Sequence, residues 1–200
     1  MLRVALTGGI ATGKSYVLDR FRKAGIPCLD ADELARGVTA AGTEATHEIA
    51  SRFGERVINA DGAVDRPKLA AIVFADDAAR RDLEAIVHPA VYRAIAAGLR
   101  GFELLGSRVV VVDIPLLYET GRAGDFARVV ATNASPVIQL TRLVDRGLSE
   151  TEARQRIAAQ MPAAEKASRA DFVINTDGTF EETDRQVADI LKILNGLAGG

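Results

Sequence analysis

The chain has 200 residues, of which 48% are hydrophobic and 26% charged, a composition typical of a globular protein with one sizeable core. Its net charge of −2 gives no overall attraction to nucleic acid or anionic membranes, and its single cysteine, Cys28, excludes an internal disulfide framework. The apolar runs are too short to cross a bilayer, and residues 1–7 lack the features of a secretion signal. We therefore expect a cytoplasmic protein without nucleic-acid or membrane partners, in which Cys28 is a small apolar residue near a strand.

In chain order, short apolar runs rich in β-branched residues predict strands at 2–7, 108–113, 128–131 and 172–175, with a weaker one at 26–30. Helical segments separate most of them. This alternation predicts an α/β fold whose mainly parallel, five-stranded sheet is covered by helices on both faces.

Helix starts are marked by residues whose side chains cap free backbone donors. Four such starts are expected, at Asp30 with Glu33, Ser135 with Pro136, Ser149 with Glu152, and Thr179 with Glu182 before a C-terminal helix at about 181–195.

Residues 33–106 contain no convincing strand, and helical periodicity dominates there. We expect breaks in this block at Gly42, Gly54, Asp61-Gly62 and His88-Pro89. The block is predicted to be an inserted helical subdomain on a single core spanning 1–200, and 136–170 a second helical excursion.

The strongest functional signal follows the first strand and matches the phosphate-loop pattern G-x-x-x-x-G-K-[ST] at Gly8, Gly9, Ile10, Ala11, Thr12, Gly13, Lys14 and Ser15. Its glycines let backbone N–H groups surround phosphates, and the following helix adds the positive end of its dipole. Lys14 supplies a cation for the β- and γ-phosphates, and the Ser15 hydroxyl suits Mg²⁺. We predict that residues 8–16 bind a nucleoside triphosphate, by default ATP, together with Mg²⁺.

Phosphate binding alone does not distinguish kinases from other nucleotide-binding proteins. The chain has no Asn-Lys-x-Asp motif for guanine, and no Asp-x-x-Gly follows the run 109–113. Helical excursions on a compact core suit phosphoryl transfer to a small acceptor, because their closure excludes water. A kinase for a small molecule is therefore favoured over a nucleotide-dependent switch or binding module, and the acceptor stays open on these residues alone.

Two carboxylates are expected at the carboxyl edge of the sheet, where ligands of such sheets bind. If Asp30 caps the next helix, Asp32 is available to orient an acceptor hydroxyl; the alternative is a residue that only decorates a first helical turn. Asp113 ends an apolar strand and is a candidate metal-side carboxylate, or else a helix or turn cap. Residues 114–119 follow on the same edge as an acceptor-pocket wall or an ordinary apolar loop.

Arginines gather in the second helical excursion. Arg142 and Arg146 are four residues apart and share a helical face, although the acids mixed among these residues also fit a solvated surface. Because phosphoryl transfer gains from a cation on the transferring phosphate, Arg142 is the preferred candidate, with Arg146 second.

The sequence resembles the dephospho-CoA kinase family over residues 2–178. The resemblance is carried by the order and spacing of matching segments, which lie at Leu6–Ile10, Gly13–Ser15, Asp30–Asp32, Val87–Pro89, Asp113–Glu119, Gln139–Arg142, Gln160-Met161, Lys166, Ala170-Asp171 and Ile174-Asn175.

The resemblance implies a nucleoside-monophosphate-kinase-like P-loop fold with a helical acceptor-binding domain and a lid. It implies ATP-dependent phosphorylation of the ribose 3′-hydroxyl of dephospho-CoA, with Asp32 as the residue that deprotonates this hydroxyl and Arg142 as the lid arginine. By the same resemblance, Asn175 lies near the nucleotide base. The implied acceptor-side residues are Asp32, His88, Leu116, Tyr118 and Glu119.

Three positions depart from the family pattern. Ala11 replaces a common second loop glycine, so its backbone must suit alanine or cost stability. Tyr16 replaces a small hydroxyl residue and is expected either to stack near the base or simply to pack. The turn at 146–148 is one residue shorter than in many relatives, which leaves the direction of Arg146 open.

Overall fold

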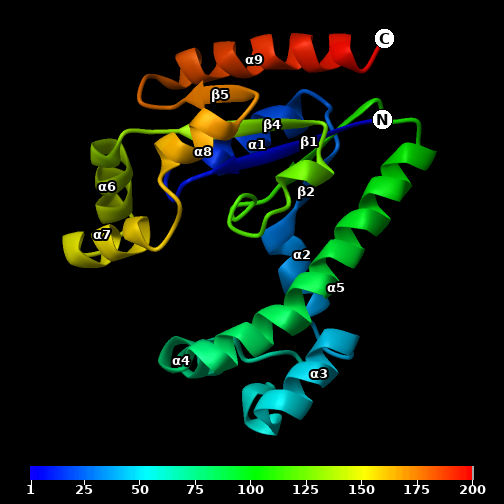
Figure 1. Cartoon of the computed structure of the whole chain (residues 1–200), viewed down its shortest axis with the longest axis vertical. Helices are drawn as coiled ribbons and strands as arrows, with labels where there is room; N and C mark the ends of the chain where they lie inside the picture. The colour runs from blue at the N-terminus through cyan, green and yellow to red at the C-terminus, as the bar shows by residue number, and fades with distance from the viewer. Residues whose placement is uncertain (200) are drawn as a thin grey trace. The chain divides into compact units, whose positions relative to one another are not determined.

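A computed structural model describes residues 1–199 (Figure 1). Its central sheet has five strands in the order β2-β3-β1-β4-β5. The strands are β1 (Leu2–Gly8), β2 (Cys28–Asp30), β3 (Val109–Asp113), β4 (Arg128–Asn133) and β5 (Phe172–Asn175). The β1–β3, β1–β4 and β4–β5 pairs are parallel, so the strand positions and the mainly parallel sheet expected from the sequence are confirmed.

Residues 1–29, together with those from Phe102 onward, form one compact unit, here called the sheet unit. Its helices are α1 (Lys14–Lys23), α6 (Pro136–Asp145), α7 (Glu150–Ala158), α8 (Ala163–Arg169) and α9 (Phe180–Leu197), with a short 3₁₀ turn at Ala123–Asp125.

The two faces of the sheet are covered by different helices. On one face, Val17 and Phe21 of α1 and Ile190 of α9 join strand residues such as Val4 and Val111 in one buried apolar cluster. On the other side, α8 contacts β1 and β4. Cys28 packs against the first cluster, and burial raises the pKa of its thiol to about 11, as fits the apolar role expected for it.

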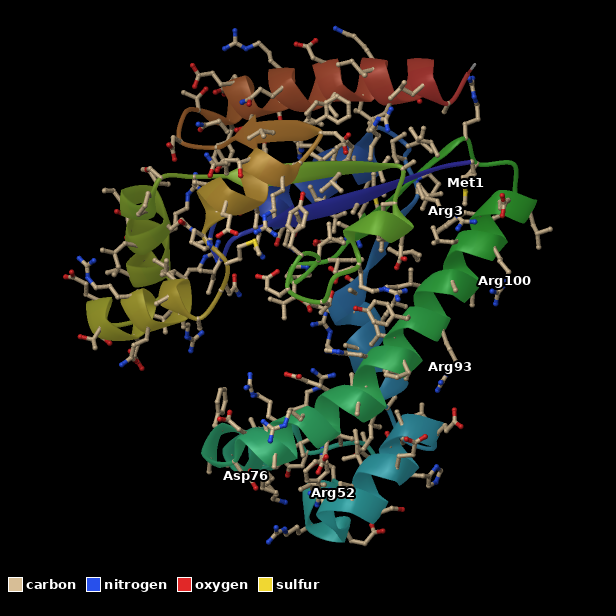
Figure 2. All side chains as sticks on the ribbon, viewed as in Figure 1. Met1, Arg3, Arg52, Asp76, Arg93 and Arg100 are labelled. Atoms are coloured by element: carbon tan, nitrogen blue, oxygen red, sulfur yellow. The ribbon has the colours of Figure 1, made fainter. Side chains whose placement is uncertain are left out.

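Residues Asp30–Gly101 form a second compact unit, here called the helical unit. It contains α2 (Ala31–Val38), α3 (Glu44–Phe53), a 3₁₀ turn (Glu55–Val57), α4 (Arg66–Ala75) and most of α5 (Asp77–Leu104). Within it, Arg52 of α3 pairs with Asp82, and Arg93 of α5 pairs with Glu44 (the two arginines are labelled in Figure 2). The expected breaks at Gly42, Gly54 and Gly62 are confirmed, and all three glycines have positive φ.

The break expected at His88-Pro89 is wrong, because α5 continues through Pro89. Proline lacks an N–H group, so the helix loses the hydrogen bond to the carbonyl of Ala85. Packing on both sides of the proline compensates for this loss. Leu83, Ile86 and Val87 pack against the apolar cluster of the helical unit, and Ala90 and Val91 are buried beyond the proline.

The N-cap residues of the four predicted helix starts are confirmed. The Asp30 carboxylate accepts hydrogen bonds from the amides of Asp32 and Glu33, and Ser135 caps α6 ahead of Pro136. Both capping boxes are complete, at Ser149 with Glu152 and at Thr179 with Glu182.

Candidate active site

The phosphate loop connects the end of β1 to the start of α1. Gly13 is the N-cap of α1 at φ 79°, a left-handed conformation that an L side chain adopts at a cost. Within the described chain no side chain caps this helix, and its first turn carries no acidic residue. The N–H groups and the positive dipole end of α1 therefore remain available to an anion.

Two threonines, Thr12 and Thr132, stabilise the loop by hydrogen bonds. The Thr12 Oγ1 lies 2.8 Å from the carbonyl oxygen of Gly9 and 2.7 Å from the Thr132 Oγ1 at the end of β4. A Cβ atom on Gly8 would clash with the Thr132 hydroxyl, so only glycine fits there. Thr132 was not expected as a site residue from the sequence, where it lies just beyond the predicted strand 128–131.

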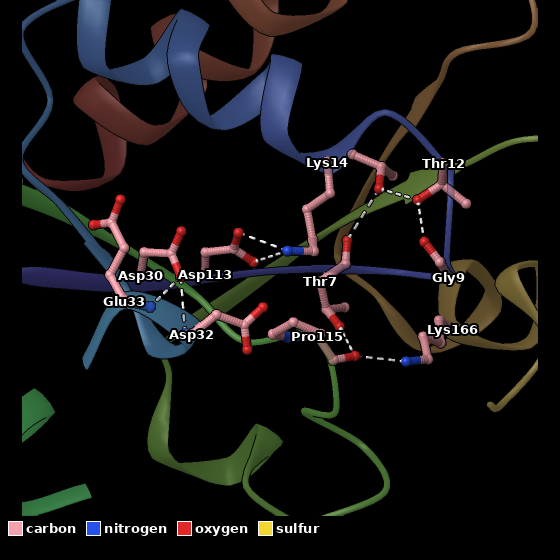
Figure 3. Close-up of polar contacts among 11 residues, drawn as sticks. Thr7, Gly9, Thr12, Lys14, Asp30, Asp32, Glu33, Asp113, Pro115 and Lys166 are labelled. Atoms are coloured by element: carbon pink, nitrogen blue, oxygen red, sulfur yellow. Dashed lines mark hydrogen bonds and ion pairs between the residues drawn. The ribbon is translucent and has the colours of Figure 1, made fainter. Parts of the chain in front are cut away.

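Lys14 and Asp113 form a nearly buried ion pair (Figure 3). The Lys14 Nζ lies 2.6 Å from both carboxylate oxygens of Asp113, and the two side chains are only 14% and 3% exposed. Two sequence-predicted site residues 99 positions apart therefore meet because β1 and β3 are neighbours in the sheet. The pair holds the Lys14 ammonium at the edge where the phosphate loop begins.

Ala11 has φ 59°, which makes it the only non-glycine residue with positive φ among residues 1–199. The alanine found at this position is therefore strained, by roughly 1–2 kcal/mol relative to a right-handed conformation. Its methyl group is buried with Leu143 of α6 and Ala153 of α7. The same residue thus carries backbone strain and attaches the phosphate loop to the second helical excursion.

Helix α6 contacts the phosphate loop through two polar side chains. The Gln139 Nε2 donates to the carbonyl of Ile10 at 2.6 Å. The Arg142 guanidinium donates to the carbonyl of Ala11 at 3.1 Å and to the carbonyl of Thr176 at 2.5 Å. Arg142 therefore lies at the phosphate loop, whereas the Arg146 side chain is exposed beyond the end of α6.

Tyr16 packs against the start of α9. Its hydroxyl is 2.8 Å from the Asp184 carboxylate, its ring centroid lies 4.7 Å from that of Phe180, and the Arg20 guanidinium lies over its ring. Of the two roles expected for Tyr16, packing is the one with contacts in the structure.

Asn175 ends β5, and its side-chain oxygen accepts a hydrogen bond from the amide of Asp177. It lines an open cavity of about 460 Å³ together with Gly178 and Glu182. The next residue in the chain after Asn175 is Thr176, which Arg142 contacts.

The turn after β3 presents three of the predicted acceptor-side residues. Leu116 is 41% exposed, whereas the Tyr118 hydroxyl is buried and has no hydrogen-bond partner among residues 1–199. Burial raises the pKa of this phenol. The Glu119 carboxylate pairs with Lys166, a contact that the sequence did not indicate.

Asp32 and His88 belong to the helical unit. Asp30 provides the cap on α2. The exposed Asp32 carboxylate makes no hydrogen bond or ion pair within residues 1–199 (Figure 3). Asp32 is therefore available to an acceptor, as expected from the sequence if Asp30 caps the helix. His88 lies in edge contact with Tyr92, at 6.3 Å between ring centroids.

In the part of the chain that the structure describes, no cluster of three or more His, Cys, Asp or Glu side chains has the arrangement of a metal site. Over the same residues, no helix combines the length and apolarity needed to span a membrane. The donors predicted for Mg²⁺ are the Asp113 carboxylate and the exposed Ser15 hydroxyl. Both are hard oxygen donors, and one or two such protein donors with substrate phosphates are a common Mg²⁺ arrangement, so the residues fit this ion.

Comparison with known proteins identifies relatives along nearly the whole chain. The family model described as dephospho-CoA kinase matches residues 2–182. A dephospho-CoA kinase of Geobacillus kaustophilus is 47% identical over 197 residues, covering 98% of both chains. One of Leifsonia xyli is 43% identical and covers 98% of this chain and all of the relative.

Solved structures show the same fold. The crystal structure of a Thermus thermophilus protein aligns with a TM-score of 0.81 at 34% identity, covering 96% of this chain and 97% of its own. The structure of a dephospho-CoA kinase from Campylobacter jejuni aligns with a TM-score of 0.75 at 24% identity, covering 97% and 98%.

Proposed function

The chain belongs to the dephospho-CoA kinase family, and we propose that it transfers the γ-phosphoryl group of ATP to the ribose 3′-hydroxyl of dephospho-CoA, giving coenzyme A and ADP. The observation that supports this most directly is the phosphate loop itself. Among the described residues no side chain caps the N-terminus of α1 that follows it, and Asp113 holds its Lys14 in place, in a chain that matches the family from residue 2 to 182. The substrate is thus a small molecule, and the reaction is a phosphoryl transfer.

The nucleotide side of the proposal rests on the sheet unit. Backbone N–H groups of residues 8–16 bind the phosphates of ATP, with Lys14 moving from Asp113 onto the transferring phosphate. Arg142 already donates to the carbonyl of Ala11 within this loop, so a small displacement of its guanidinium brings a second cation to the γ-phosphate. Asn175 and the cavity beside it accept the base.

In the chemical step, the 3′-oxygen of dephospho-CoA attacks the γ-phosphorus while the bond to the β–γ bridging oxygen breaks. The hydroxyl proton passes to the Asp32 carboxylate, which has no competing partner among the described residues. Positioning and charge stabilisation account for most of the catalysis, because phosphoryl transfer requires little covalent chemistry from the protein.

Ser15 and Asp113 are the residues that would hold Mg²⁺, which supplies charge neutralisation on the β- and γ-phosphates when bound. Lys14 leaves Asp113 for the phosphate in this proposal, and its departure ends the two contacts between the ammonium and the carboxylate oxygens.

The acceptor side of the proposal rests on the family resemblance. The proposed acceptor contacts are His88, Leu116, Tyr118 and Glu119, with 33–106 as acceptor-binding subdomain and 136–170 as lid. The Tyr118 hydroxyl supports this assignment, because it is buried without a partner among the described residues and is therefore available to a polar group of a ligand.

An acceptor panel tests the proposal. ADP release is measured with Mg·ATP and either dephospho-CoA, nucleoside monophosphates or sugars, against a control without acceptor. We expect ADP release only with dephospho-CoA. Transfer only to another acceptor would support the assignment as a kinase but reject dephospho-CoA as the substrate. Slow ADP release independent of any acceptor would indicate a nucleotide-dependent switch.

A further inference from the structure

Lys166 lies on α8 and is completely buried, with a side-chain exposure of 0%. A buried ammonium is costly unless charged and polar groups surround it, so such a lysine is rarely found without a specific set of partners. Here the Nζ donates to the carbonyl of Pro115 at 2.6 Å and lies 2.8 Å from the Glu119 Oε1 (Figure 3 shows the contact with Pro115). Both partners belong to the turn that follows β3.

These partners are shared with other parts of the site. The Pro115 carbonyl also accepts a hydrogen bond from the hydroxyl of Thr7, the residue immediately before the phosphate loop (3.2 Å). The Glu119 Oε1 also accepts one from the amide of Met161, in the connection between α7 and α8 (3.2 Å). One ammonium therefore joins the end of β1, the turn after β3 and the start of α8.

The turn held in this way begins at the residue that pairs with Lys14. Pro115 follows Asp113 by two positions, and both Asp113 and Ile114 are buried. A shift of the Pro115 carbonyl would therefore be transmitted to the Asp113 carboxylate and to the Leu116–Glu119 segment. Misplacement of reacting groups by about 1 Å can cost roughly 10²-fold in rate.

We propose that Lys166 is a positioning residue for phosphoryl transfer, which acts through Pro115 and Glu119 to hold the segment 113–119 at the carboxyl edge of the sheet. In this role Glu119 supports the acceptor segment by the pairing of its Oε1 with Lys166, in addition to the acceptor contact proposed for it. The inference deepens the function proposed above and rests on it for its kinetic consequences.

The kinetic test compares K166M, which keeps the length of the side chain but loses its donors, with E119A and the double variant. K192M is the matched control, because Lys192 pairs with Asp189 on the exposed surface of α9. We expect K166M to lower kcat by roughly 10- to 100-fold and to raise KM for dephospho-CoA, while KM for ATP changes less than about threefold. The double variant should lose less than the product of the two single losses, since both remove one interaction.

Hydrogen exchange measured on the nucleotide-free protein provides a readout that needs no acceptor. In K166M the amides of Thr120, Gly121 and Met161, which have hydrogen-bond partners in the wild type, should exchange at least about tenfold faster, with α9 unaffected. If K166M does not fold, E119A, which changes a partly exposed side chain, gives the readout at Thr120 and Gly121 only, because it removes the acceptor of the Met161 amide directly.

The outcomes separate the two proposals. Wild-type protein without transfer to dephospho-CoA would refute the proposed function, and the exchange experiment would still decide the role of Lys166. Unchanged exchange in this turn, or wild-type kcat and KM per folded molecule despite a lower Tm, would overturn the positioning role. Strictly multiplicative losses in the double variant would also overturn it, because Glu119 would then act independently of Lys166.

Discussion

Replacement of Asp113 by asparagine should destabilise the nucleotide-free protein substantially, because Lys14 and Asp113 are nearly buried and lie 2.6 Å apart. At that separation the attraction is roughly 6 kcal/mol for an effective dielectric constant of about 20, and the desolvation of both ions offsets a large part of it. Removing one partner of a buried pair costs about 3–5 kcal/mol, since the other charge stays behind. Asparagine retains one acceptor and Lys14 is 14% exposed, so we expect about 3 kcal/mol.

For a chain of this size, that loss corresponds to a decrease in Tm of roughly 6–12 °C. The assay is thermal unfolding of the nucleotide-free protein followed by calorimetry. D189N is the matched control, because Asp189 pairs with Lys192 at a highly exposed position and its replacement should cost less than about 0.5 kcal/mol. A D113N protein that melts no lower than D189N would refute the conclusion that this ion pair stabilises the phosphate-loop edge.

Four further substitutions, at three positions, test the loop and the proposed catalytic groups. A11G should change the free energy of unfolding by less than about 1 kcal/mol, because relief of the strain at φ 59° offsets the lost buried methyl group and the greater freedom of glycine in the unfolded chain. A11V should lower the free energy of unfolding by more than about 2 kcal/mol. Urea unfolding distinguishes the two variants, and equal losses would contradict the proposed strain at Ala11. D32N should lower kcat by about 10²–10⁴ while the Kd for ATP measured by calorimetry barely changes, and an unchanged kcat would remove Asp32 from the chemistry. R142A should slow transfer by roughly 10²-fold, more than it weakens ATP binding in the same assays; a loss confined to binding would make Arg142 a docking residue.

Much of the fold could be predicted because its signals are local. Runs of β-branched residues mark the strands, and Ser149 and Thr179 mark helix starts, through contacts between residues three apart. The exception is Pro89, where a strong local signal for a break is overridden by apolar contacts on both sides of the helix.

The site was predictable where a motif defines it and less so where the topology does. The phosphate-loop pattern identified Lys14, and the end of a strand identified Asp113, yet their direct pairing depends on the neighbouring positions of β1 and β3. The sequence also showed that Ala11 stands at a position suited to glycine, and the left-handed backbone explains why.

Contacts made across long separations could not be predicted. Thr132 lies just beyond the predicted strand 128–131, and Lys166 is one of the positions that carry the family resemblance, yet nothing near either residue in sequence reveals its partners. The Lys166 ammonium reaches a carbonyl 51 residues away, and its complete burial follows from the packing of α8 on the sheet. Such residues become recognisable only when the elements are placed together.

The most direct test of the proposed reaction is to locate the transferred phosphate. Dephospho-CoA and Mg·ATP are incubated with the protein, and the product is examined by phosphorus NMR and mass spectrometry. We predict one added phosphoryl group, coupled to the ribose 3′-proton and indistinguishable from that of authentic coenzyme A. A phosphate on the 2′-oxygen or on the pantetheine end, or no phosphorylated product while ATP is bound, would contradict the proposed function.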